Sequence, residues 1–223
     1  MDRTIIEERK TTIEKEKTIF EKNGTIETKY QNFILREFRD YKIIREIDAA
    51  GAEADIYFAE KDGQRYVIKL YRGGIVPNKA IIDIVSEISN KYPDKFIKII
   101  EFGFDNSTQH YFEVQEQALF GSIEEYISGK TDETKTMKKI IEQINEALEI
   151  LHNNNILHLD LKPANILVKN NEPLEIVLAD FGGASQIDED ISKKMTAVKG
   201  TEIYYSPEAS AGVVERKSDY WSL

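Results

Sequence analysis

Two polar clusters stand beside short apolar runs in the second half of the chain. The segment ILHLDLKPANILV contains Asp160, Lys162 and Asn165. The segment LADFGG follows it and contains Asp180. A carboxylate can orient an attacking hydroxyl group and accept its proton, and an ammonium group can lie beside a transferred phosphoryl group. Amide and carboxylate oxygens suit Mg²⁺. The spacing therefore predicts phosphoryl transfer, with Asn165 and Asp180 at the metal.

The elements that must position these groups follow from the apolar patterns. YKIIREI, ADIYFAE and RYVIKLY, separated by a loop at DAAGAEA and a turn at KDG, predict an antiparallel meander with Lys69 on its third strand. Residues 78–92 have helical spacing, and KFIKIIEFGF and HYFEVQEQ return to strand. GSIEEYIS predicts a short helix, and NILV and EIVLAD predict two short strands beside the polar clusters. Residues 134–154 predict an amphipathic helix with an apolar face made of Met137, Ile140, Ile141, Ile144, Ala147, Leu148 and Leu151.

Residues 1–40 differ from the rest of the chain because they are rich in Lys, Glu and Thr. Asn23-Gly24 predicts a hairpin turn, since both residues tolerate positive φ. A helix through the Lys/Glu run is the alternative. We interpret this part as an N-terminal extension.

Composition limits the class of protein. A hydrophobic fraction of 41% is sufficient for a core, and the net charge of -10 disfavours nucleic-acid and anionic-membrane partners. The absence of cysteine excludes disulfides and thiolate metal sites. No apolar run is long enough to span a membrane, and the N-terminus is too charged for a signal peptide. These features predict a cytoplasmic protein.

The polar clusters resemble the protein-kinase signature H-R-D-L-x-x-x-N followed by D-F-G. Here the signature is His158-Leu159-Asp160-Leu161-x-x-x-Asn165 and Asp180-Phe181-Gly182. From about Tyr41 onward the chain resembles the serine/threonine protein kinases of bacterial type. The other matching blocks, in order, are VIK with Lys69, the hinge-like EVQEQA, the docking loop and Ser206-Pro207-Glu208 in KGTEIYYSPEASAG, and KSDYWSL with Asp219.

The resemblance implies an α+β, bilobal fold that uses ATP and Mg²⁺. Its parts would be an N-terminal extension at 1–40, an N-lobe at 41–117 with a small antiparallel sheet and one helix, and a mainly helical, partial C-lobe at 118–223. Lys69 would hold the α- and β-phosphates, and Asp219 would hold the catalytic-loop backbone. The other implied nucleotide-binding residues are Gly51 and Ile56 of the glycine loop, Glu116 and Ala118 of the hinge, and an acid that pairs with Lys69. That acid is Asp83, by register, or Glu87, by reach; we favour Glu87.

Three departures from the family pattern affect function. Only Gly51 of the three loop glycines is present, which predicts weaker ATP binding. Leu159 replaces the arginine that binds an activation-loop phosphate, so we expect no switching by phosphorylation through that contact. The family's large lobe continues beyond the point where this sequence ends, so we expect either a fragment of a longer protein or a minimal kinase. We expect a homodimer, a partner chain or the N-terminal extension to cover the apolar face of SDYWSL.

The substrate type follows from another part of the resemblance. Thr201 is expected to contact Asp160 and Lys162, which together with LKPAN favours Ser/Thr substrates.

The main functional hypothesis is a Ser/Thr protein kinase that transfers the γ-phosphate of Mg·ATP to protein hydroxyls. The first alternative is a pseudokinase or ATP-binding regulatory module, which the poor glycine loop favours. The second is a small-molecule kinase such as the antibiotic phosphotransferases. That class resembles the catalytic loop but lacks LKPAN, DFG and the docking block.

Overall fold

The computed structural model describes residues 20–22, 25–27, 37–47, 53–127, 133–187, 192–195 and 200–223, with the backbone alone for the first two ranges and for 133–135. The contacts divide the chain into one unit of Met1–Ile43 and another of Ile44–Leu223. The strands of the first unit are β1 (Phe20–Lys22), β2 (Thr25–Glu27), β3 (Glu37–Phe38) and the start of β4 (Tyr41–Ile47). β1 pairs with β2 antiparallel in the register Lys22↔Thr25, which confirms the predicted hairpin. The two turn residues and the first 19 residues, and with them most of the Lys/Glu run, lie outside the described part.

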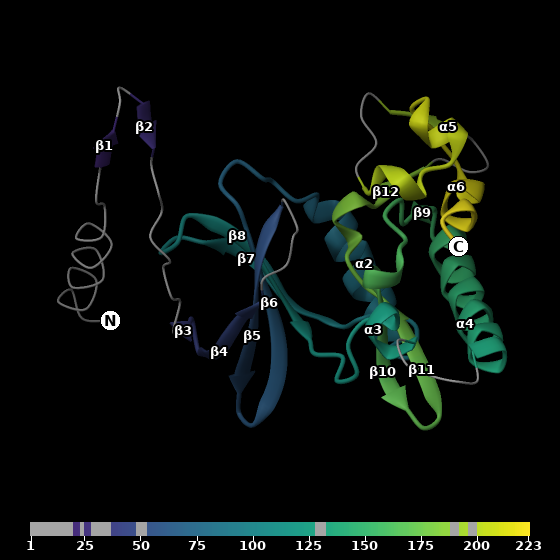
Figure 1. Ribbon diagram of the computed structural model, residues 1–223, viewed down its shortest axis with the longest axis horizontal. Helices are drawn as coiled ribbons and strands as arrows, with labels where there is room; N and C mark the ends of the chain where they lie inside the picture. The colour runs from purple at the N-terminus through teal and green to yellow at the C-terminus, as the bar shows by residue number, and fades with distance from the viewer. Residues whose placement is uncertain are drawn as a thin grey trace. The chain divides into compact units, whose positions relative to one another are not determined.

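The main sheet belongs to the second unit (Figure 1), and Lys69 lies on one of its strands. From the end of β4 its strand order is β4, β5 (Ala54–Lys61), β6 (Gln64–Tyr71), β8 (His110–Glu116) and β7 (Ile99–Asp105). The pairs of β5 with β6, β6 with β8 and β7 with β8 are antiparallel, and the first of them agrees with the predicted meander. The β5–β6 turn contains Asp62 and Gly63 at φ 52° and 74°, residue types that tolerate positive φ.

Among the described residues of this lobe, one helix, α2 (Lys79–Lys91), accompanies the sheet. Asn78 caps its N-terminus, because the Asn78 side chain accepts a hydrogen bond from the N–H of Ile81. The buried side is made of Ile81, Ile82, Val85, Ile88 and Ser89. The segment after α2 is bonded to the other lobe: the Ile97 N–H donates to Leu178 O, and the Leu178 N–H donates to Lys95 O, both at 2.9 Å. The C-terminal end of α2 is therefore anchored.

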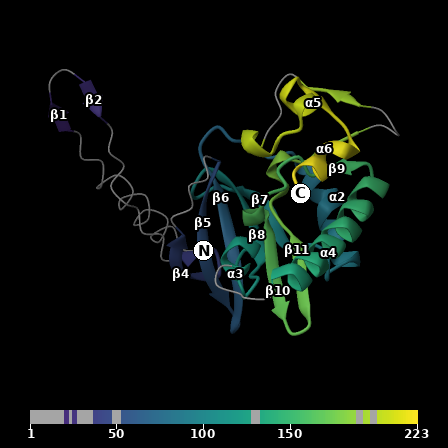
Figure 2. The ribbon, with the colours of Figure 1, turned by 45° about the vertical axis from the view of Figure 1, so that its right-hand side comes forward.

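The second lobe is mainly helical, as predicted. Its helices are α3 (Ile123–Ile127), α4 (Glu133–Asn153), α5 (Pro207–Ser210) and α6 (Arg216–Trp221). Its short strands are β9 (Ile156–Leu157), β10 (Ile166–Asn171), β11 (Leu174–Leu178), β12 (Ser185–Gln186), β13 (Lys193–Lys194) and β14 (Val213–Val214). In both ribbon views α4 lies along the β10–β11 hairpin (Figures 1 and 2). None of the described helices has the length and apolar character needed to cross a membrane.

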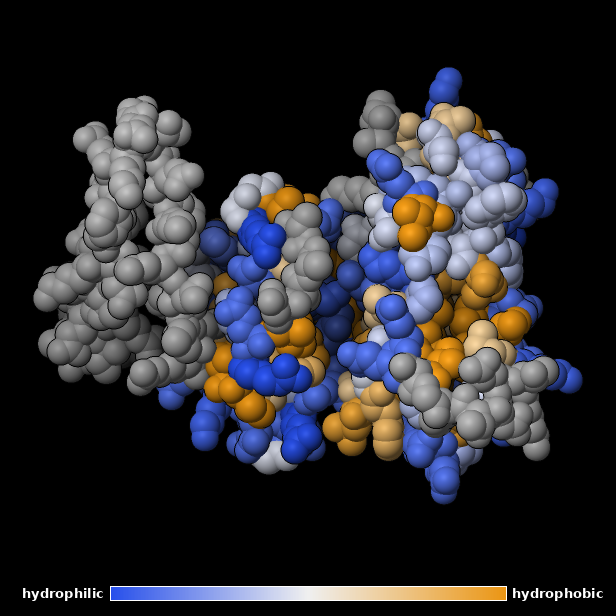
Figure 3. All heavy atoms as spheres, viewed as in Figure 1, coloured by the Kyte–Doolittle hydropathy of each residue, from blue (hydrophilic) through white to orange (hydrophobic). Residues whose placement is uncertain are grey.

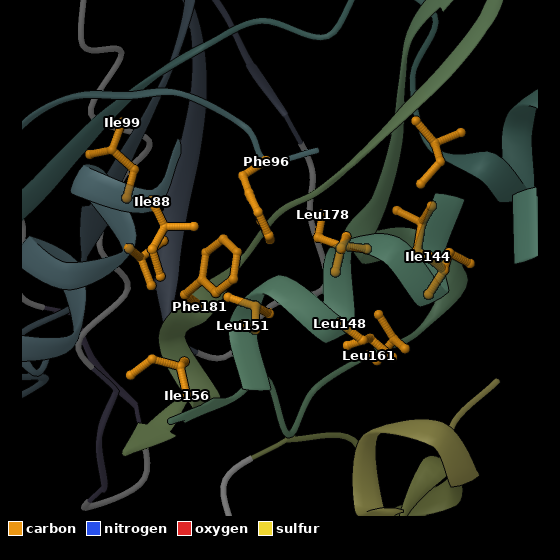
Figure 4. Packing of buried hydrophobic residues seen from close by; sticks show 14 of the residues in the cluster. Ile88, Phe96, Ile99, Ile144, Leu148, Leu151, Ile156, Leu161, Leu178 and Phe181 are labelled. Carbon is orange, nitrogen blue, oxygen red and sulfur yellow. The ribbon is translucent and has the colours of Figure 1, made fainter. Parts of the chain in front are cut away.

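One apolar core connects the two lobes. Phe181 is 7% exposed and lies among Ile88 of α2, Phe96 and Leu151 of α4 (Figure 4). The Phe96 and Phe181 rings are 6.2 Å apart. The predicted face of α4 is buried at Ile140, Ile144, Ala147, Leu148 and Leu151. Met137 and Ile141 of that predicted face are instead 37% and 44% exposed, because they lie at the edge of the apolar stripe.

Candidate active site

Lys69 and Asp180 form an ion pair between the two lobes. Lys69 projects from β6, and its Nζ lies 2.9 Å from Asp180 Oδ1. Asp180 follows β11 at φ 64° and ψ 77°, in the left-handed region that costs a non-glycine residue about 1–2 kcal/mol. The chain then turns into the short 3-10 helix Phe181–Gly183, whose phenylalanine is in the core. The buried Phe181 thus fixes the position at which the Asp180 carboxylate meets Lys69.

The electrostatics keep both groups charged. Burial by itself lowers the pKa of Lys69, but the carboxylates of Asp180 and then Glu113 outweigh burial and raise that pKa above its ordinary value. The Lys69 ammonium in turn lowers the pKa of Asp180 to about 2, against the effect of burial. The Lys69 side chain is only 11% exposed, so its charge is screened less than that of a surface lysine. Such an ammonium group is suited to hold phosphate oxygens.

Four hydrogen-bond donors converge on the carboxylate of Asp160. Oδ1 accepts from the N–H and the hydroxyl of Thr201 at 2.8 and 2.9 Å. Oδ2 accepts from Lys162 Nζ at 3.0 Å and from Asn165 Nδ2 at 2.9 Å. Lys162 Nζ also donates to Thr201 Oγ1 at 2.7 Å, which confirms the predicted contacts of Thr201. An ionised carboxylate accepts about four hydrogen bonds, so a substrate hydroxyl group has to displace one of these donors.

Asp219 of α6 holds the backbone of the catalytic loop, as predicted. Its carboxylate is 1% exposed and accepts from the N–H groups of His158 and Leu159 at 3.0 and 2.8 Å. His152 Nε2 lies 2.8 Å from the same carboxylate. Leu159 has φ 61°, so these two bonds hold a backbone conformation that leucine rarely adopts. His158 braces the loop, with Nε2 3.1 Å from Ala179 O.

Asn165 directly precedes β10 and Asp180 follows β11, so both lie at the open end of the β10–β11 hairpin. Ile166 pairs with Leu178, and the next N–H along, that of Ala179, donates to Asn165 O at 2.9 Å. The Asp180 side chain is 44% exposed, and the Asn165 amide donates through Nδ2, which leaves its oxygen for another partner. Within the described ranges no three His, Cys, Asp or Glu side chains gather as a metal site. Mg²⁺ commonly uses one or two protein ligands with phosphate oxygens and waters, so these two residues fit Mg²⁺ bound together with a nucleotide.

Comparison with known proteins identifies the family. The protein kinase domain model matches residues 50–223. The chain belongs to the protein kinase domain family. Its bilobal fold, with the antiparallel N-lobe sheet and a mainly helical second lobe, agrees with that membership.

Several serine/threonine kinases are similar to this kinase domain. 3-phosphoinositide-dependent protein kinase 1 of Rattus norvegicus is 33% identical over 190 residues, which are 83% of this chain and 32% of the rat protein. Serine/threonine-protein kinase dkf-2 of Caenorhabditis briggsae is 32% identical over 73% of this chain and 14% of its own. Calcium-dependent protein kinase 4 of Plasmodium falciparum is 36% identical over 56% of this chain and 24% of its own. The chain thus spans less than a third of the length of these curated relatives. The finer resemblance to bacterial kinases stays a prediction.

The segment predicted to be the hinge lies at the end of β8. The Glu116 N–H donates to Lys98 O at 3.0 Å, and its side chain accepts from Lys169 Nζ of β10 at 2.7 Å. Ala118 is half-buried beside Ile97. After it, Leu119 and Phe120 are 62% and 43% exposed. Figure 3 shows apolar residues, in orange, scattered among hydrophilic ones on the face that it displays. The adenine contacts of Glu116 and Ala118 stay predictions.

The phosphate-binding loop is described only at its end. Gly51 lies outside the described residues, whereas Ile56 lies on β5 opposite Lys69. Arg72 braces this end, because its side chain donates to Asp55 Oδ1 at 2.8 Å and its N–H donates to Glu53 O at 2.9 Å. The Glu53 carboxylate borders Gly182: an added Cβ there would lie 3.4 Å from Glu53 Oε2 and 3.4 Å from Asp180 Oδ1.

The two helix acids that the sequence favoured as partners of Lys69 lie elsewhere in this structure. Asp83 Oδ2 is 2.6 Å from Lys79 Nζ, and Glu87 is exposed on α2. The ion pair of Lys69 is with Asp180 instead. Glu113 was not among the residues predicted from the sequence; it is 5% exposed and lies opposite Lys69 in the register of β6 and β8. A signal was present, since an acid inside the apolar strand HYFEVQE is unusual.

Leu159 lies in a separate apolar cluster of the kinase domain. The cluster consists of Leu157, Leu159, Ile187, Ala209 and Val214, with Met195 and Tyr205 packed against it. Leu159 is 7% exposed. Gly200 lies so close that an added Cβ would be 2.5 Å from Leu159 O. The position that the family fills with arginine is therefore filled here by a leucine that packs with Ile187 and Tyr205 of the activation segment, the stretch from Asp180 to Glu208.

Proposed function

We propose that this kinase domain is a Ser/Thr protein kinase that transfers the γ-phosphate of Mg·ATP to protein hydroxyl groups. The observation that carries the proposal is the convergence of Lys162, Asn165 and Thr201 on the carboxylate of Asp160. In this cluster Asp160, which would orient the substrate hydroxyl group, lies beside Lys162, which would contact the transferred phosphate. The similarity to relatives that are named serine/threonine-protein kinases supports the same substrate class.

Each residue has a distinct part in the proposed reaction. Lys69 holds the α- and β-phosphates, and Asn165 with Asp180 holds Mg²⁺, which neutralises charge on the phosphates. Asp160 orients the substrate hydroxyl group and accepts its proton, after the hydroxyl replaces a present donor such as Thr201 Oγ1. Lys162 stabilises the negative charge on the transferred group. A cytoplasmic location and a homodimer or partner chain also stay predictions.

A nucleotide-binding melt tests the proposal directly. We expect ATP with Mg²⁺ to raise the melting temperature, and ATP without Mg²⁺ to raise it much less, because Asp180 and the phosphates would repel one another without the metal. Incubation with labelled ATP should then label a protein substrate on Ser or Thr. An Mg²⁺-dependent shift without transfer would favour the pseudokinase alternative. No shift at all would contradict both functions.

We propose further that activity does not depend on reading an activation-loop phosphate beside Asp160. Burial of a leucine contributes about 1.5–3 kcal/mol, which is comparable with a charge-assisted hydrogen bond of about 1.5–3 kcal/mol. The apolar cluster around Leu159 can therefore hold the activation segment without a phosphate.

This independence can be tested with two threonine variants. Thr196, which lies outside the described residues, is the candidate phosphate acceptor. Thr196→Ala should keep activity within about twofold, because Leu159 offers no phosphate contact. Thr201→Ala should lower activity at least about tenfold, because it removes hydrogen bonds to Asp160 and Lys162. A Thr196→Ala variant as inactive as Thr201→Ala would contradict the proposal, and mass spectrometry of the loop would show whether Thr196 carries phosphate.

A further inference from the structure

Glu113 is an acid buried inside the N-lobe sheet. Only 5% of the residue is exposed, and it lies in the apolar middle of β8. Its Oε2 accepts from the hydroxyl of Tyr71 at 3.2 Å, and its Oε1 accepts from Gln115 Nε2. Burial and then the Glu113 carboxylate raise the pKa of Tyr71 well above its ordinary value, so Tyr71 is a neutral donor. Both hydrogen-bond partners are uncharged, and a buried carboxylate also needs a compensating cation.

The strand register places a cation, Lys69, opposite Glu113. Lys69 and Glu113 are direct partners in the register of β6 and β8. Side chains directly opposite each other on antiparallel strands share one face, with Cβ atoms about 4.5–5.5 Å apart. Tyr71 and Gln115 are each two residues along the same strands and therefore share this face. Lys69, Tyr71, Glu113 and Gln115 thus form one polar cluster behind the predicted phosphate site.

The acids of α2 point away from this cluster. The buried side of α2 contains Ile81, Val85 and Ile88. Asp83 and Glu87, four residues apart, share the opposite, exposed side of the helix. To bring either acid to Lys69, the helix would have to rotate and expose part of its apolar side. The bonds of Ile97 and Leu178 also anchor the segment that follows α2.

We propose that Glu113, rather than an acid of α2, is the carboxylate that positions Lys69 for the nucleotide phosphates. The inference rests on the proposed function, because the phosphates are the ligand of Lys69. Asp180 holds Lys69 in this structure, but Asp180 also serves as a metal ligand in the proposed complex. Glu113 lies on the neighbouring strand and remains opposite Lys69 in either state. Lys69 is therefore aligned without any movement of α2, and Glu113 acts as a positioning residue.

A double-mutant cycle without nucleotide tests the pairing itself. Lys69→Met and Glu113→Gln are made singly and together, and the urea midpoints are compared. We expect the shifts of the two single variants not to add, because each removes the partner of the other. The matched cycle of Lys69→Met with Glu87→Gln should be additive. Additivity for Glu113 together with coupling for Glu87 would overturn the inference. If Glu113→Gln alone does not fold, the double variant should fold better, because it leaves no unpaired buried charge.

Nucleotide binding gives the second readout. We expect Glu113→Gln to weaken Mg·ATP binding about tenfold and to raise KM for ATP more than it lowers kcat. Glu113→Asp, which keeps the charge, should recover most of the affinity for Mg·ATP. If Glu113 had only a structural role, Glu113→Asp would bind Mg·ATP as weakly as Glu113→Gln. Glu87→Gln should change the Kd by less than about twofold. The reverse pattern would refute the role of Glu113. If the unmodified protein binds no Mg·ATP, the proposed function fails, while the nucleotide-free cycle still decides whether Glu113 pairs with Lys69.

Discussion

An Asp160→Asn variant is expected to lose phosphoryl transfer while it continues to bind Mg·ATP. A positioned general base contributes about 10²–10⁴-fold to a rate, and an amide cannot take its place. The side-chain NH₂ of asparagine would also face donors, because both carboxylate oxygens of Asp160 accept hydrogen bonds from Thr201, Lys162 and Asn165. Binding should persist because Lys69 and Asp180 are unchanged.

The measurement compares initial rates of labelled phosphate transfer with the Kd for Mg·ATP. Asp94→Asn is the matched control, since the Asp94 side chain is 59% exposed and lies on the segment between α2 and β7. Its rate should equal that of the unmodified protein. An Asp160→Asn variant that retains more than about a tenth of the rate would rule out Asp160 as the base, given the size of that contribution.

Among the proposed variants, Asp219→Ala is expected to show the largest fall in the free energy of unfolding. The substitution removes the acceptor of the N–H groups of His158 and Leu159 and the partner of His152. An unsatisfied buried donor costs about 1–3 kcal/mol, so leaving these two backbone N–H groups unpaired costs about 2–6 kcal/mol. This is a large part of the about 5–15 kcal/mol that stabilises an ordinary domain. The urea midpoint should fall with little change in slope.

Asp219→Asn provides the comparison for that experiment. Asparagine keeps one oxygen that can accept from the Leu159 N–H, so we expect a smaller fall in the midpoint than with alanine. Amide hydrogen exchange at Leu159 should accelerate in the alanine variant, because the bond that protects it is lost. An unchanged midpoint in Asp219→Ala would mean that α6 does not hold the catalytic loop.

The local parts of the site could be predicted from the sequence. Asp160, Lys162 and Asn165 stand in one short loop, so their spacing along the chain nearly determines their spacing in space, and the structure brings them together. The strands β4, β5 and β6 and the helix α2 follow the apolar patterns, because one face of each must be buried. The edge of the predicted apolar face of α4 was less certain, as the exposed Met137 and Ile141 show.

Long-range partners were decided only by the tertiary structure. Asp83 and Glu87 have the right chemistry for Lys69, but the packing of α2 turns both outward. Glu113 faces Lys69 because of a strand register that no local pattern reveals. The sequence by itself determined which residues can do the chemistry, since residue type and short spacing are local. The fold decided which charges meet and that Leu159 is buried in an apolar cluster, because register and packing depend on the whole chain.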